Sequence, residues 1–209
     1  EVLGIYIFLL LFLYYLKTRR FRNLVVCFSC LLCLGIYHTV MRWYDRPCPS
    51  LVFYNVRGCP AIHCIAEDGT SWLNYADTLS DKRRLQAVAA NYWRRHQLLP
   101  PIEVTADCQN VDFCRHQQIV FYHGCRICMV TDNRWRNKSA ASPLFINYMY
   151  LCKGYNGRLE ELTGLFSPSC ILLDASLSDD RKQFFREECK RLHLHFITLS
   201  EEGSVRFLL

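Results

Sequence analysis

The chain has 209 residues, of which 51% are hydrophobic and 21% are charged, and its formal net charge is +6 at pH 7. After two uncharged apolar runs at the N-terminus, about 165 residues remain, which is one ordinary domain with its own core and excludes an array of domains. The charge is uneven, because residues 82–158 carry twelve Lys or Arg against four acids and residues 159–209 carry six against nine. This asymmetry is compatible with a mixed surface or with a basic face for a polyanion.

The N-terminal segment predicts a two-helix transmembrane hairpin over residues 1–45. Residues 2–16 and 24–41 are uncharged, and the link at 17–23 carries four cations and no acid. A spanning helix needs about 20 mostly apolar residues, range ~17 to 25, so the second run qualifies and the first is slightly short. The alternative is a signal peptide followed by a core helix. However, no basic region precedes the first run and no small-residue cleavage site follows it.

The cations of the link predict the orientation of the hairpin. They are Lys17, Arg19, Arg20 and Arg22. Lys and Arg in short loops remain cytoplasmic, so residues 50–209 are expected on the extracytoplasmic side, in the periplasm of a bacterium. Arg42 and Arg46 follow the second run and oppose this orientation, two cations against four.

The first part of the outer domain predicts a β-meander and one helix. Strands are expected at 50–56, 61–65 and 72–75, with a turn at 67–70. A helix capped by Ser80 or Asp81 is expected to run to about residue 97, with Arg83, Arg84, Arg94 and Arg95 facing solvent. Pro100 and Pro101 end it.

The second part of the outer domain predicts parallel βαβ pairing. A hairpin at 118–122 and 125–130, turning at His123 and Gly124, leads into a loop at 131–138. Strands at 145–152, 171–173 and 195–199 then alternate with helices at 159–166 and 178–192, the second capped by Ser178. A turn at 200–203 and a strand at 204–208 close the domain. We therefore expect an α/β (α+β) sandwich over residues 50–209.

The interpretation of the thirteen cysteines depends on the compartment in which each of them lies. Cys27, Cys30 and Cys33 lie in the second apolar run at helical spacing and are interpreted as packing residues. The other ten would face an oxidising space, so disulfides are possible, but a sequence cannot pair them. Cys125 and Cys128 have the spacing of half a zinc knuckle. They lie on a predicted strand, where residues three apart point to opposite faces, so buried thiols are favoured.

Three segments carry a resemblance to a known family. Residues 52–62 (VFYNVRGCPAI) stand where that family has a motif close to hydrophobic-LDVGQGD-hydrophobic. Residues 129–132 resemble a strand ending in Thr-Gly-Asp, and residues 150–155 one ending in His-His-Gly. With the apolar runs, the meander and the closing turn-Gly-x-hydrophobic strand, nearly the whole chain resembles the C-terminal part of ComEC, the competence protein that conducts DNA across the inner membrane. Residues 54–57, 132–138 and 151–155 resemble its Bacteroidetes branch.

The resemblance implies a metallo-β-lactamase-like domain, and the departures from it bear on catalysis. A hydrolase of that fold needs imidazole and carboxylate ligands converging on a metal, and the cluster His-x-His-x-Asp-His is absent from this sequence. Asp132 keeps the position of one ligand, but Cys152 and Lys153 replace the His pair. His193 and His195 have strand-like spacing without an evident third ligand. We therefore interpret the domain as degenerate, with no catalytic residue, metal or other cofactor.

Two functions are compatible with this sequence. In the first, the chain is the C-terminal portion of a multi-pass inner-membrane DNA-uptake channel, and the outer domain guides or gates DNA without hydrolysis. Its partners are then DNA, as a single strand in transit, membrane lipid and the part of the same protein upstream of Glu1, with no small-molecule substrate. Cations would neutralise phosphates and an aromatic would stack on bases. The candidates are Arg134, Trp135, Arg136, Lys138, Arg94 and Arg95.

The basic, aromatic loop at 132–138 is also compatible with an ordinary surface or with contact to lipid headgroups. The second function is a membrane-anchored metal-dependent hydrolase or nuclease that uses Asp132 with scattered histidines. Metal content and nuclease activity discriminate between the two functions.

Overall fold

A computed structural model describes residues 2–209 except 19–20, 45–47, 77–81, 97 and 111. The chain divides into two compact units, Glu1–Arg46 and Pro47–Leu209. The predicted caps Ser80 and Asp81, and the topology residues Arg19 and Arg20, lie outside the described residues.

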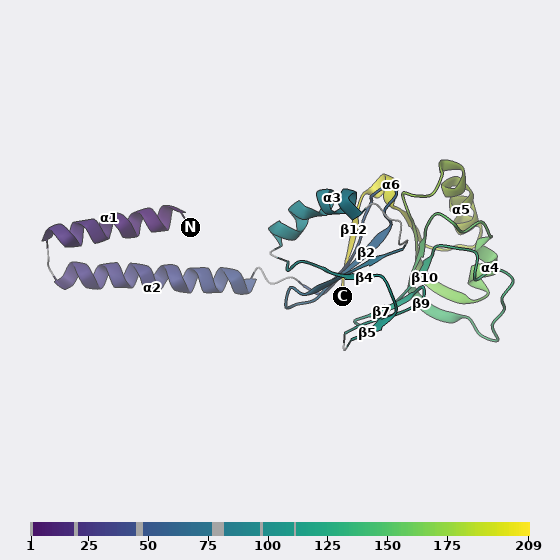
Figure 1. Cartoon of the computed structure of the whole chain (residues 1–209), viewed down its shortest axis with the longest axis horizontal. Coiled ribbons are helices and arrows are strands. Elements are labelled where there is room, and N and C mark those ends of the chain that lie inside the picture. Colours follow the sequence, from purple (N-terminus) through teal and green to yellow (C-terminus); the bar gives the residue numbers. More distant parts are fainter. Residues whose placement is uncertain (1, 19–20, 45–47, 77–81, 97, 111) are drawn as a thin grey trace. The chain divides into compact units, whose positions relative to one another are not determined.

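The first unit consists of two helices, α1 (Val2–Thr18) and α2 (Phe21–Tyr44), which lie side by side and antiparallel (Figure 1). Among the described residues, one helical segment is long and apolar enough to cross a membrane, Phe21–Val40, with 20 residues and a mean hydropathy of 1.8. Almost none of it is buried within the protein, unlike a core helix. With 17 residues, α1 does not reach that length. The predicted pair of spans is therefore supported for one helix.

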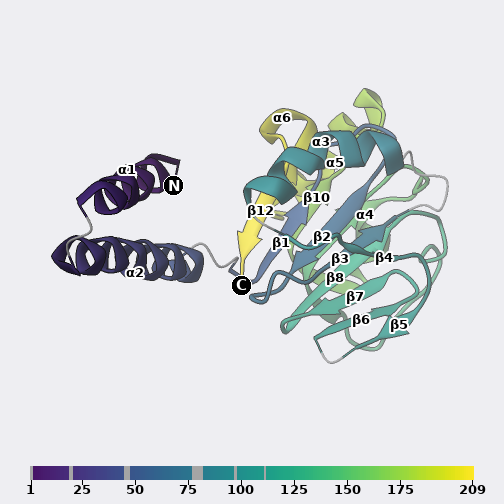
Figure 2. The same ribbon diagram turned by 60° about the vertical axis from the view of Figure 1, so that its left-hand side comes forward.

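The second unit contains two mixed sheets. The first has the strand order β12-β1-β2-β3-β4 and the second has the order β11-β10-β9-β8-β7-β6-β5 (Figure 2). The strands of the first sheet are β1 (Ser50–Phe53), β2 (Ala61–Ile65), β3 (Ser71–Tyr75), β4 (Ile102–Val104) and β12 (Val205–Leu208). Those of the second are β5 (Cys108–Gln109), β6 (Phe113–His116), β7 (Ile119–Tyr122), β8 (Cys125–Val130), β9 (Leu144–Leu151), β10 (Phe166–Leu173) and β11 (Phe196–Thr198).

The sheets and helices form four layers. Leu51 and Phe53 of β1 pack between the sheets against Tyr150 of β9, whereas Val52 points outward to helix α3 (Lys82–Arg95). Beyond the second sheet lie α4 (Leu159–Thr163) and α5 (Asp179–Arg191), and the short α6 (Leu199–Glu202) precedes β12. Both faces of β1 are thus covered, which explains why all four of its residues are buried. The expected α+β sandwich is confirmed at this level.

The parallel pairing predicted for the second part is confirmed. Strand β10 pairs in parallel with both β9 and β11, and β8 also pairs in parallel with β9. The helix after Ser178 is confirmed with its cap, because the Ser178 hydroxyl accepts a hydrogen bond from the Arg181 backbone N–H. The predicted turn at His123 and Gly124 is also present, and both residues have positive φ.

Several element boundaries differ from those expected. Strand β1 ends at Phe53 rather than at residue 56, and the expected turn at 200–203 is the helical turn α6. Strands β4, β5 and β6 were not expected from the sequence. They have two to four residues each and, in β4 and β5, little burial. Such short strands show no recognisable hydrophobic alternation in the sequence. They form because they pair with neighbouring strands.

Candidate functional site

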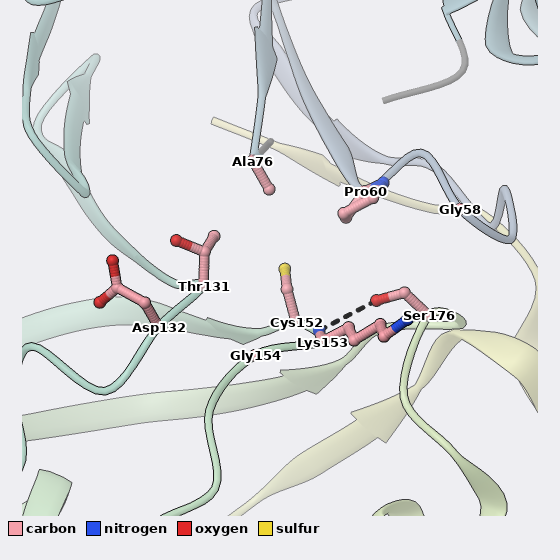
Figure 3. Close-up of a pocket in the computed structure, with 9 residues that line it drawn as sticks. All are labelled: Gly58, Pro60, Ala76, Thr131, Asp132, Cys152, Lys153, Gly154 and Ser176. Atoms are coloured by element: carbon pink, nitrogen blue, oxygen red, sulfur yellow. Dashed lines mark hydrogen bonds between the residues drawn. The ribbon is translucent and has the colours of Figure 1, made fainter. Parts of the chain in front are cut away.

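A pocket lies where three parallel strands end. Thr131 follows β8, Cys152 follows β9 and Ser176 comes shortly after β10, so their side chains meet at the carboxyl edge of the second sheet. Gly58, Pro60 and Ala76 of the first sheet's loops form the facing wall (Figure 3). The volume is about 550 Å³. In α/β proteins, ligands bind outside the carboxyl ends of parallel strands, so this pocket is the candidate site.

The pocket brings together segments distant in sequence. It contains Gly58 and Pro60 of the first family-like segment, Thr131 and Asp132 of the second, and residues 152–154 of the third. The three segments that carry the resemblance therefore line a single cavity. Sequence reasoning found these segments but missed Ala76 and Ser176, although the end of the predicted strand at 171–173 was a signal for the latter.

Cys152 and Lys153 give the floor of the pocket an unusual chemistry. Figure 3 shows the Cys152 thiol pointing toward Pro60 and Ala76. The residue is 1% exposed, and burial raises the pKa of its thiol well above the usual value, with the nearby Asp174 adding to the effect. Lys153 is exposed, and its backbone N–H donates to the Ser176 hydroxyl over 3.1 Å. The site therefore presents a neutral thiol and an ammonium group.

Asp132 is engaged by a neighbouring cation. Its carboxylate accepts hydrogen bonds from Arg134 Nε and Nη2 at 2.8 to 3.0 Å. Partial burial alone would raise the pKa of Asp132, but the hydrogen bonds and charge of Arg134 outweigh burial and hold the pKa below its usual value. Asp132 is therefore a carboxylate already held in an ion pair.

A buried pair supports the pocket from below. The Tyr150 hydroxyl donates to Asp174 Oδ1, and Asp174 Oδ2 accepts from the Ser176 backbone N–H over 2.7 Å. Both Tyr150 and Asp174 are fully buried. Burial raises the pKa of Asp174 despite the hydrogen bonds it accepts, and it raises the pKa of Tyr150 well above the usual value. The pair fixes the turn that carries Ser176.

The pocket does not fit a metal ion. Among the described residues, no three His, Cys, Asp or Glu side chains lie together in a way that could hold one. Of the two possible ligands in the pocket, Asp132 is bound to Arg134 and Cys152 is a thiol of raised pKa. A zinc-binding cysteine has to be a thiolate, and the Lys153 ammonium would repel a cation.

The loop at 131–143 connects β8 to its parallel neighbour β9. A parallel connection needs a crossover of about a dozen residues or more, so the fold itself requires a long loop here. Arg134 is paired with Asp132, and Arg136 Nε lies 3.3 Å from Glu161 Oε2. Arg134 and Arg136 are exposed, whereas their partners Asp132 and Glu161 are partly buried. Both cations of the loop therefore lie at the surface of the domain, each already paired with a carboxylate.

Trp135, the aromatic that the sequence offered for stacking on bases, packs against the domain. Its indole is half-buried, packs edge-to-face on Phe166 at 5.0 Å, and donates from Nε1 to Gln118 Oε1 over 2.6 Å. Gln118 in turn donates to Thr131 Oγ1 of the pocket. Lys138 Nζ lies 5.3 Å from the indole centroid. The indole is held against the domain by its packing on Phe166 and by the hydrogen bond from its N–H to Gln118. Trp135 therefore anchors the loop.

The remaining candidates lie elsewhere. Arg94 and Arg95 are exposed in the last turn of α3 and do not join the loop at 131–143. Among the described residues no disulfide joins any two cysteines, so the disulfides that the sequence allowed are not present there. Cys125 packs between the sheets and Cys128 on the helix side, in agreement with the predicted opposite faces. His195 Nδ1 lies 3.2 Å from Cys170 Sγ.

The fold and the pocket define a four-layer α+β domain with a cleft at the ends of its parallel strands. A family model described as ComEC C-terminal domain matches residues 51–209. The chain therefore belongs to the ComEC family of membrane proteins in competence and DNA uptake, as the sequence resemblance indicated. Comparison with curated proteins gave no match, and comparison with solved structures gave none either.

Proposed function

We propose that this chain is the C-terminal portion of an inner-membrane DNA-uptake channel, and that its outer domain guides or gates DNA without hydrolysing it. Membership of the ComEC family supports the DNA-uptake role. The proposed domains are the transmembrane hairpin at 1–45 and a degenerate metallo-β-lactamase-like domain at 50–209. Two facing sheets flanked by helices, with all three family-like segments on one pocket, support that fold.

One observation supports the part of this proposal that excludes hydrolysis. At the place where a hydrolase of that fold needs metal ligands, this chain has a protonated thiol, an ammonium group and a carboxylate bound to arginine. Lys153 instead brings a positive charge to the lining of the pocket, and Arg134 lies beside it in the ion pair with Asp132. Such an arrangement suits phosphates of a passing strand.

The metal test is direct. We expect the purified full chain to contain no stoichiometric zinc or manganese and to leave DNA uncleaved. One bound transition metal per chain that is lost on Asp132→Ala would refute the proposal and favour the membrane-anchored hydrolase.

We propose the loop residues Arg134, Arg136 and Lys138 as DNA contacts. Binding should be weak and indifferent to sequence, and it should weaken steeply with salt. Because each neutralised phosphate of a single strand contributes about 0.7 to the salt slope, the double variant Arg134→Gln/Arg136→Gln should lower the slope by about 1.4. Fluorescence anisotropy of a labelled oligonucleotide with the full chain in nanodiscs, at several salt concentrations, measures the slope.

Two comparisons make the DNA test specific. Arg126→Gln/Lys190→Gln removes the same charge from exposed positions away from the pocket and should leave the slope unchanged. Trp135→Ala should lower the free energy of unfolding, because it removes the contact with Phe166 and the bond to Gln118. Equal slopes for both double variants, or no salt-dependent binding at tens of micromolar, would contradict loop contact.

The proposed orientation places the loop between α1 and α2 in the cytoplasm and the outer domain in the periplasm. Of the four cations behind it, Lys17 and Arg22 are within the described residues. A reporter fused after Leu209 should be active outside the cytoplasm, and a lysine reagent confined to the outside should label Lys153 but not Lys17. Labelling in the reverse pattern would refute this orientation.

A further inference from the structure

A second, apolar cavity lies on the outer side of the first sheet, between α3 and β4. Its volume is about 380 Å³. Its apolar walls include Leu73, Ala90, Trp93, Leu98, Leu99 and Pro101. Trp93 is fixed there because its Nε1 donates to the Tyr54 hydroxyl over 2.9 Å. This groove shares no residue with the pocket at the carboxyl ends of β8, β9 and β10.

Strand register places one end of the groove at the edge where the chain enters the outer domain. Ser50 pairs with Ile65, and Ile65 with Ser71, so these residues share one edge of the first sheet. The Leu99 backbone N–H donates to Gly69 in the turn between Ile65 and Ser71. Two strand spacings of about 4.8 Å place Ser71, at the far side of this turn, about 10 Å from Ser50. The pocket residues Gly58 and Ala76 follow the opposite ends of β1 and β3.

The covalent link restricts this edge to the neighbourhood of a membrane. The candidate span ends at Val40 and β1 begins at Ser50. Ten residues extend at most about 35 Å, and those of the last turns of α2 rise by only about 1.5 Å each. The edge at Ser50 therefore lies within about 35 Å of the end of the candidate span.

The charges at the groove match an anionic headgroup above an apolar chain. Arg94 lines the groove, and its Nη2 donates to Asn91 Oδ1 over 3.0 Å, while Arg95 beside it is exposed. The one carboxylate among the lining residues, Glu103, is neutralised by Lys82 Nζ at 2.6 Å. At the mouth, Leu99 is 54% exposed. Cations beside exposed apolar side chains are typical of membrane-interface contacts.

We propose that this groove binds a membrane phospholipid, with an acyl chain against Trp93 and Leu99 and the phosphate at Arg94 and Arg95. The inference rests on the proposed membrane attachment of the outer domain. It assigns Arg94 and Arg95, which sequence reasoning offered as DNA contacts, to lipid.

The test uses a photo-cross-linking residue, p-benzoylphenylalanine, in the full chain. The chain is reconstituted in nanodiscs of phosphatidylcholine and phosphatidylglycerol, with the probe at Leu99 or, as the control, at Ser139 in the exposed loop beyond the pocket. Irradiation should give a lipid adduct at position 99, detected by intact mass, and none at 139. Equal lipid adducts at both positions, or a cross-link at 99 to protein instead of lipid, would overturn the proposal.

A second experiment compares the effect on the lipid adduct of removing a positive charge at either end of α3. Because a cation near an anionic surface contributes a factor of about five to membrane association, Arg94→Gln should reduce the adduct at position 99 about fivefold. Arg83→Gln, in the first turn of α3, should leave it unchanged. An equal effect of both variants would also overturn the proposal. Normal DNA binding with no adduct would refute the lipid site alone, whereas an intact adduct without DNA binding would refute the DNA role alone.

Discussion

The buried pair beneath the pocket provides the sharpest test of the structure. Tyr150→Phe removes one hydroxyl and leaves Asp174 Oδ1 without the donor that the structure assigns to it. Both side chains are fully buried, so water does not replace the lost bond. A hydrogen bond to a charged group contributes about 1.5 to 3 kcal/mol. We therefore expect the free energy of unfolding at pH 7 to fall by about 2 to 3 kcal/mol.

The pH dependence of this loss follows from the direction of the Asp174 shift. Burial raises the folded-state pKa of Asp174, so the carboxylate destabilises the folded state. That cost begins as the pH rises through the unfolded pKa of about 3.9 and is complete above the folded pKa. Without the Tyr150 hydroxyl the folded pKa rises further. The loss should therefore shrink to about 1 kcal/mol near pH 4, the value for a neutral hydrogen bond.

The assay is urea unfolding of the full chain in detergent, followed by tryptophan fluorescence at pH 7 and pH 4. Tyr148→Phe is the matched control on the same strand, because among the described residues its hydroxyl has no hydrogen-bond partner. It should change stability by less than about 0.5 kcal/mol. The same loss at both pH values, or an equal loss in the control, would refute the reasoning.

Substitutions at four single positions should also change the stability of the domain. Gly154 has φ +119 and an added Cβ would lie 2.1 Å from the Thr131 carbonyl oxygen, so Gly154→Ala should cost about 3 kcal/mol or more. Gly58→Ala, with φ +83 and open space, should cost only about 1 kcal/mol in the same urea titration. Ser178→Ala should cost about 1 kcal/mol through loss of the helix cap, and no measurable loss would contradict the capping geometry. Burial lowers the pKa of His63 to about 3, so the wild type should lose up to about 1.4 kcal/mol per pH unit below pH 6.5, a slope that His63→Gln should lack.

Local patterns in the sequence were enough for most of the elements. Hydrophobic periodicity, the Ser178 cap and the turn at His123 and Gly124 depend on neighbours within a few residues, and the structure contains all of them. The alternation of strands and helices predicted the parallel pairing of β9, β10 and β11, because such connections need a crossover.

What the sequence could not decide depends on contacts between distant segments. Strands β4 to β6 are too short to carry a period, and they form only by pairing. The partners of Trp135 are Phe166 and Gln118, and no local rule places an indole against residues 31 and 17 positions away. The sequence determined which charges and aromatics the loop carries. Only the tertiary structure decided that Trp135 anchors the loop, that Asp132 is bound to Arg134, and that three separate segments share one pocket, because burial and ion pairing are set by packing.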